Sequence, residues 1–150
     1  MAENSTTIAA TPEQVFDVLL DAWSYKDWVV GCDEIRGVDD NWPAVGSRFH
    51  HTVGFGPAKT DDDTKILEVD APRRLLLEAS ARPAGVAEVE FLVEPDSEGE
   101  QTTITINERI VDGPADAIPT PLVDVGLKLR NLETLRRLKN VVESRVAAAG

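Results

Sequence analysis

Two ionisable side chains occupy positions where the alternation of the chain predicts apolar ones. His51 is in phase with Phe49 and Val53, and Glu108 is in phase with Ile106. Burial of an unpaired charge is costly, or it shifts the pKa of the group until the group is neutral. Each side chain therefore needs a hydrogen-bond partner, water or a ligand, unless its strand frays or bulges and lets it reach solvent.

The chemistry that suits these two side chains is acid and base catalysis. Aldol cyclisation needs a base that removes a proton next to a carbonyl group and a donor for the enolate oxygen. His51 would serve as the base, with Glu108 orienting the imidazole or acting as the acid. Arg36 would stabilise an oxyanion if its strand turns it inward, but the phase that it shares with Cys32 and Glu34 does not give the direction.

Composition excludes several other kinds of site. Cys32 is the only cysteine, so an intrachain disulfide is impossible and a cytoplasmic location is the simplest expectation. Two histidines and one cysteine are too few for most zinc sites, and we expect neither a metal nor a cofactor. The first seven residues lack the pattern of a secretion signal, and no stretch approaches the ~20 apolar residues of a membrane span.

The net charge of −12 argues against nucleic acid and against an anionic membrane surface as partners. The charge is uneven, because residues 1–120 carry −15 and residues 121–150 carry +3. A final helix with cations toward its C-terminal end, packed against an acidic body, accounts for this difference.

Aromatic side chains are concentrated near the N-terminus, where Trp23, Tyr25, Trp28 and Trp42 lie within twenty positions. Two interpretations remain open. Trp28 packs short helices onto the sheet while Trp42 holds a turn, or one or two of these residues line the entrance of a pocket.

The elements that position these residues follow from hydrophobic periodicity. After a short strand at 6–9, Thr11–Gln14 has the residues of a capping box, which predicts a helix over 12–21 and then a shorter one over 25–29. A period of two predicts strands near 32–39, 47–54, 58–70, 73–82, 85–94 and 101–111. The acidic run Asp61–Asp63 is poor strand material and indicates an edge, a bulge or a loop.

The period becomes helical from Pro121 to about Ala147. The predicted apolar stripe of this helix consists of Leu122, Val125, Leu129, Leu132, Leu135, Leu138 and Val142. Short turns between six successive strands exclude a doubly wound parallel sheet, which needs crossover helices. We predict one α+β domain over residues 1–150, in which the long helix covers one face of an antiparallel sheet of about seven strands.

Small residues face the covered side of this sheet or lie on the helix; they are Ala79, Ala81, Ala87 and Gly126. A sheet curved around one helix, with small residues on both sides, leaves a cavity unless Leu and Phe side chains fill the space. His51 and Glu108 would be the polar groups of that cavity.

Five segments resemble the polyketide cyclase/dehydrase and lipid-transport group of the SRPBCC (START-like, helix-grip) superfamily. They are Ile8–Leu19, Tyr25–Trp28, Val45–Phe49, Val69–Leu75 and Asn131–Lys139. The resemblance covers nearly the whole chain and implies a curved antiparallel sheet that grips a long C-terminal helix, with a hydrophobic ligand cavity between them. The superfamily includes aromatase/cyclases, lipid carriers and hormone receptors, and it shares no invariant catalytic motif, so it assigns no catalytic residue.

Three functions remain open. The first is a carrier or sensor that binds a small hydrophobic molecule, such as a lipid, an aromatic or a polyketide-like compound. The second is a polyketide cyclase/dehydratase-type enzyme with His51 and Glu108 as candidate catalytic residues. The third is a protein-interaction or regulatory domain with a closed core and a basic partner. The sequence does not distinguish a monomer from a homodimer.

The candidate ligand-binding residues combine the inward strand positions, the aromatic cluster and the helix stripe. They are Trp28, Arg36, Phe49, His51, Val53, Phe55, Leu77, Ala79, Val89, Phe91, Ile106, Glu108, Val125 and Leu129. Gly54–Pro57, which includes Phe55, and the proline-rich connection 112–121 are the candidate segments at the mouth.

Overall fold

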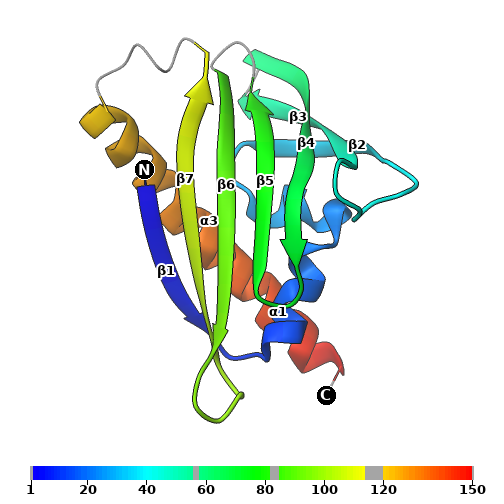
Figure 1. Ribbon diagram of the computed structural model, residues 1–150, viewed down its shortest axis with the longest axis vertical. Helices are drawn as coiled ribbons and strands as arrows, with labels where there is room; N and C mark the ends of the chain where they lie inside the picture. Colours follow the sequence, from blue (N-terminus) through cyan, green and yellow to red (C-terminus); the bar gives the residue numbers. More distant parts are fainter. Residues whose placement is uncertain (1, 56–57, 82–84, 114–119, 150) are drawn as a thin grey trace.

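The computed structural model describes residues 2–55, 58–81, 85–113 and 120–149, which form one sheet and a set of helices against it (Figure 1). The elements in chain order are β1 (Ala2–Ile8), α1 (Pro12–Leu19), the 3₁₀ turn η1 (Ala22–Ser24), α2 (Tyr25–Trp28), β2 (Cys32–Val38), β3 (Arg48–Phe55), β4 (Ala58–Asp70), β5 (Arg74–Ala81), β6 (Gly85–Pro95), β7 (Thr102–Asp112) and α3 (Thr120–Ala149). This is the predicted helix-grip architecture.

All seven strands belong to one antiparallel sheet in the order β1-β7-β6-β5-β4-β3-β2. Among the described residues β1 and β2 are the edge strands, and α3 runs diagonally across one face of the sheet (Figure 1). The alternation predicted for the strands is confirmed, because β6 buries Val89, Phe91 and Val93 on the helix side and leaves the side chains between them partly exposed.

The start of α1 forms as its sequence indicates. The side chain of Thr11 accepts a hydrogen bond from the Gln14 backbone N–H, and the Gln14 side chain accepts one from the Thr11 backbone N–H. This capping box fixes the point at which the chain leaves β1, so α1 and α2 are directed across the end of the sheet.

Two predicted elements differ from the structure. The first strand extends over Ala2–Ile8 rather than 6–9, because the polar residues Asn4 and Ser5 belong to an edge strand that pairs only with β7. The acidic run lies inside β4, which is a continuous strand between β3 and β5, and Asp62 is buried in phase with Thr64.

Three hydrogen bonds connect α3 to β1 and to the residue that follows it. The Asn4 amide donates to the Lys128 carbonyl, the Lys139 ammonium donates to the Thr7 carbonyl, and a Glu143 carboxylate oxygen accepts from the Ala9 backbone N–H. These bonds fix the height of the helix along the sheet.

The predicted stripe of α3 is wrong in its first half. Leu122, Val125, Leu129 and Leu132 are 66, 57, 67 and 61% exposed, whereas Leu135, Leu138 and Val142 are buried. An α-helix turns by about 100° per residue, so a spacing of three residues falls about 60° short of a full turn. The three consecutive spacings of three from Leu129 to Leu138 carry the stripe about 180° around the helix.

No helix among the residues that the structure describes is long and apolar enough to cross a membrane.

Candidate functional site

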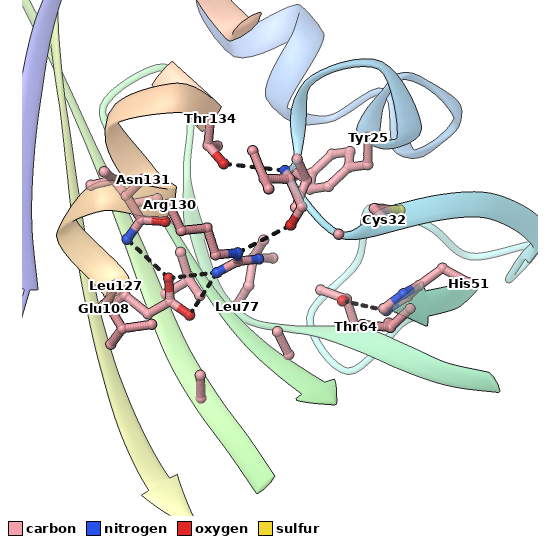
Figure 2. Close-up of a pocket in the computed structure, with 18 of the residues that line it drawn as sticks. Tyr25, Cys32, His51, Thr64, Leu77, Glu108, Leu127, Arg130, Asn131 and Thr134 are labelled. Carbon is pink, nitrogen blue, oxygen red and sulfur yellow. Dashed lines mark hydrogen bonds and ion pairs between the residues drawn. The ribbon is translucent and has the colours of Figure 1, made fainter. Parts of the chain in front are cut away.

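A cavity of about 430 Å³ lies between the sheet and the first half of α3 (Figure 2). This volume is within the range of ~300–1,000 Å³ that is typical of ligand pockets. The described residues that line it are Tyr25, Trp28, Val29, Val30, Gly31, Cys32, Phe49, His51, Val53, Thr64, Leu77, Ala79, Ser80, Gly85, Ala87, Val89, Phe91, Ile106, Glu108, Ile110, Leu127, Arg130, Asn131 and Thr134. Most of the wall is therefore apolar.

Ten candidate ligand-binding residues lie in this wall: Trp28, Phe49, His51, Val53, Leu77, Ala79, Val89, Phe91, Ile106 and Glu108. They come from strands β3, β5, β6 and β7 and from α2, whose inward faces meet here. The small side chains of Ala79 and Ala87 leave space that larger residues would fill. Gly126 is exposed and does not contribute to the wall, and the side chain of Ala81 lies outside the described residues.

Arg36 does not reach the cavity. Strand β2 has register shifts between Cys32 and Glu34 and between Ile35 and Gly37. These irregularities break the period of two, so Cys32 lines the cavity and Ile35 is buried, while Arg36 is exposed and donates to the carbonyls of two other strand residues. Its proposed role at an oxyanion in the cavity is therefore wrong.

Val125 and Leu129 are also not in the wall, because they lie on the exposed face of α3. The inward face of this half of the helix consists instead of Leu127, Arg130, Asn131 and Thr134. The side chain of Phe55 lies outside the described residues, as do positions 56–57 and 114–119 of the two candidate mouth segments.

His51 is 5% exposed and its Nε2 lies 3.0 Å from the Thr64 hydroxyl oxygen across the β3–β4 pair. The ring stacks at a tilt against Phe49, with centroids 5.2 Å apart. Burial lowers the pKa of His51, although the nearby Asp63 backbone and the carboxylates of Asp62 and Asp63 act in the opposite direction. Its Nδ1 is buried and has no hydrogen-bond partner among the described residues.

Glu108 is 4% exposed and receives hydrogen bonds from two α3 residues. Arg130 Nη1 lies 3.0 and 3.2 Å from the two carboxylate oxygens, and the Asn131 amide nitrogen lies 3.0 Å from Oε1. Glu108 is therefore held by α3 and does not orient His51, whose ring partner is Thr64.

Arg130 and Thr134 also hold the segment between α2 and β2. The Nε of Arg130 donates to the Val30 carbonyl at 3.1 Å, and the Val30 backbone N–H donates to the Thr134 hydroxyl at 3.2 Å. Figure 2 shows this network on one side of the pocket and the His51–Thr64 pair on the other. Arg130, Asn131 and Thr134 could not be predicted, because they lie off the predicted apolar stripe and nothing in their local pattern marks them.

The aromatic cluster is divided between packing and the cavity. Tyr25 and Trp28 line the cavity and are buried, with ring centroids 4.5 Å apart, and the Tyr25 hydroxyl donates to the Leu19 carbonyl. Trp42 holds the β2–β3 connection by donating from Nε1 to the Leu20 carbonyl, and Trp23 is exposed. Trp28 is fully buried and packs against Tyr25 and Phe91, so the packing interpretation is confirmed for Trp28 and Trp42. Trp28 also forms part of the cavity wall, and a position at its entrance stays a prediction.

A model of the family described as "Polyketide cyclase / dehydrase and lipid transport" matches residues 2–143. No curated protein matches the chain in sequence.

Solved structures with the same fold include the Zhui aromatase/cyclase from a Streptomyces species, at 17% identity and a TM-score of 0.73 over 99% of this chain and 96% of that one. A START superfamily protein from Mycobacterium smegmatis has 16% identity and a TM-score of 0.69 over 99% and 98%. The di-domain ARO/CYC protein BexL has 16% identity and a TM-score of 0.72 over 95% of this chain and 46% of that one. At these identities the likeness is one of fold.

Proposed function

The chain belongs to the polyketide cyclase/dehydrase and lipid transport family, and from this premise we propose that it binds a small, largely hydrophobic molecule as a carrier or sensor. The observation that carries the proposal is the cavity of about 430 Å³ under α3, whose wall is mostly aliphatic and aromatic. A close-packed interior would have filled this space with side chains. The ligand would be a lipid, an aromatic or a polyketide-like compound.

The test is thermal unfolding of the protein with a panel of lipids, aromatic compounds and polyketide-like compounds. A ligand at a hundredfold excess over its Kd stabilises the folded chain by about 2.7 kcal/mol, which corresponds to a rise in Tm of roughly 5–10 °C. Tryptophan fluorescence provides a second readout, because Trp28 is the only tryptophan in the described wall of the cavity. The proposal fails if no compound in the panel changes either signal.

A variant that fills the cavity sharpens this test. Ala87 lines the cavity and is buried, so Ala87→Phe places a ring in the space that the ligand would occupy. We expect this variant to fold and to lose the ligand-dependent rise in Tm. Ala148→Phe, on the exposed end of α3, is the matched control and keeps the rise.

A second candidate function is an enzyme of the cyclase or dehydratase type. The position and the protonation of His51 favour it. The ring lies in the cavity wall with a lowered pKa, so it is neutral near pH 7 and suited to act as a base. His51→Ala would then keep ligand binding and lower turnover by at least about 100-fold. The control is His50→Ala, which removes a ring paired with Asp39 and would keep turnover. Equal turnover in His51→Ala rejects this role.

The third hypothesis, an interaction domain with a closed core, gains no support from a chain that encloses a cavity.

A further inference from the structure

The charges in the cavity wall cancel. Among the described lining residues only Glu108 and Arg130 are formally charged at neutral pH, and they form an ion pair with 3.0 Å between Nη1 and Oε1. His51 adds no positive charge, because burial favours its neutral form. A negatively charged ligand would therefore meet no uncompensated cation in an apolar pocket, within a chain whose net charge is −12.

The Nη2 group of Arg130 is a hydrogen-bond donor in the wall without a protein acceptor among the described residues. Arg130 uses Nε on the Val30 carbonyl and Nη1 on Glu108, and its Nη2 makes no hydrogen bond with any described residue. Figure 2 shows the guanidinium group extending into the pocket from α3. The side chain is 36% exposed, so Nη2 is hydrated while the pocket contains water.

These two observations limit the chemistry of a ligand. A hydrocarbon that displaces water from Nη2 leaves the N–H groups of a cation without acceptors, which is costly. A carboxylate satisfies them but brings a charge that Glu108 opposes. A neutral oxygen acceptor satisfies the N–H groups and leaves the Glu108–Arg130 pair intact.

We propose that the cavity takes a neutral, largely apolar molecule with a carbonyl or hydroxyl oxygen, and that Nη2 of Arg130 donates to that oxygen. The inference rests on the proposed function and specifies its ligand class. It also orients the ligand, because the oxygen lies at the α3 side while the apolar body contacts Leu77, Val89 and Phe91.

Three naphthalene compounds of matched shape test the inference. They are 2-acetylnaphthalene, which carries a ketone; 2-isopropenylnaphthalene, which replaces the oxygen by a methylene group; and 2-naphthoate, which carries a carboxylate. Titration calorimetry should show that the ketone binds at least about tenfold more tightly than either of the others, since hydrogen bonds to charged groups contribute about 1.5–3 kcal/mol.

The variant removes both charges together, because Arg130→Met alone would leave Glu108 buried and unpaired. In the double variant Arg130→Met/Glu108→Gln, the preference for the ketone over the hydrocarbon should fall to about twofold or less, while the hydrocarbon binds as before. Arg136→Met removes an exposed arginine of α3 that pairs with Glu133, and it should leave the preference unchanged. A thermal melt of each variant verifies that it is folded.

Three results would overturn the inference: equal affinity for ketone and hydrocarbon, tightest binding of the carboxylate, or a ketone preference that survives in the double variant. In each of these cases the compounds still bind the protein, so the proposed function stands, and Ala87→Phe tests whether they bind in the cavity. If none of the three compounds binds, the inference fails as well, and the wider ligand panel decides independently whether the proposed function fails with it.

Discussion

His51 and Glu108 show what can be read from single positions in a sequence. Their phase predicted that both face the covered side of the sheet, and both are buried there. Their partners could not be predicted in the same way. Thr64 reaches His51 through the pairing of β3 with β4, and Arg130 and Asn131 reach Glu108 from a helix about twenty residues later. Such contacts depend on how elements dock, which local alternation does not encode.

Cys32 gives a prediction at the same scale. Burial, with a smaller contribution from the Asp33 carboxylate, raises the pKa of its thiol to about 11, while Arg130 acts in the opposite direction. As the pH rises from about 9 to 11, the thiol therefore ionises in the unfolded chain before it ionises in the folded chain. Ionisation of Cys32 therefore lowers the free energy of unfolding over that range. We expect iodoacetamide to alkylate the native protein at pH 8 more slowly than the denatured protein. Equal alkylation rates in the native and denatured proteins would show that folding does not protect the Cys32 thiol. Cys32→Ser is the control for reaction at other residues.

Elements were predicted well where one local pattern determines them and poorly where the pattern is interrupted. The strands from β2 to β7 lie within one or two residues of their predicted bounds, because Gly and Pro turns separate clear alternations. The inward face of β2 was not predictable, since two irregularities shift its phase around Ile35. The prediction of which α3 side chains face the sheet was wrong for the first half of the helix, because apolar residues with three successive spacings of three do not stay on one face.

The two halves of α3 should therefore respond differently to the same substitution. Leu135 is buried in the core, so Leu135→Ala should lower the free energy of unfolding by about 2–4 kcal/mol. Leu129 is exposed, so Leu129→Ala should change it by about 0.5 kcal/mol or less. Urea denaturation followed by circular dichroism measures both. A larger loss for Leu129→Ala than for Leu135→Ala would mean that α3 is rotated from the orientation described above.

At the scale of the whole molecule, the uneven charge of the sequence is used in docking the last helix. Arg130 pairs with Glu108 on β7, and Arg145 pairs with Asp21 after α1, at 2.7 Å. The first of these pairs is also what leaves the cavity wall without net charge. The sequence predicted a basic helix on an acidic body and a space beneath it. It could not show that the helix would turn polar side chains toward that space.

Edge protection is a further consequence of the bonds that two α3 side chains form with Thr7 and Ala9, at the end of β1. An edge strand presents unpaired backbone groups that can recruit a strand from another molecule. Here the Thr7 carbonyl is covered by Lys139 and the Ala9 backbone N–H by Glu143. We expect the double variant Lys139→Ala/Glu143→Ala to aggregate through β1 at temperatures where the unaltered protein stays monodisperse. Light scattering measures this, and Arg136→Ala/Glu133→Ala, which removes an ion pair elsewhere on α3, is the control. Equal aggregation of the two variants would show that helix side chains do not shield this edge.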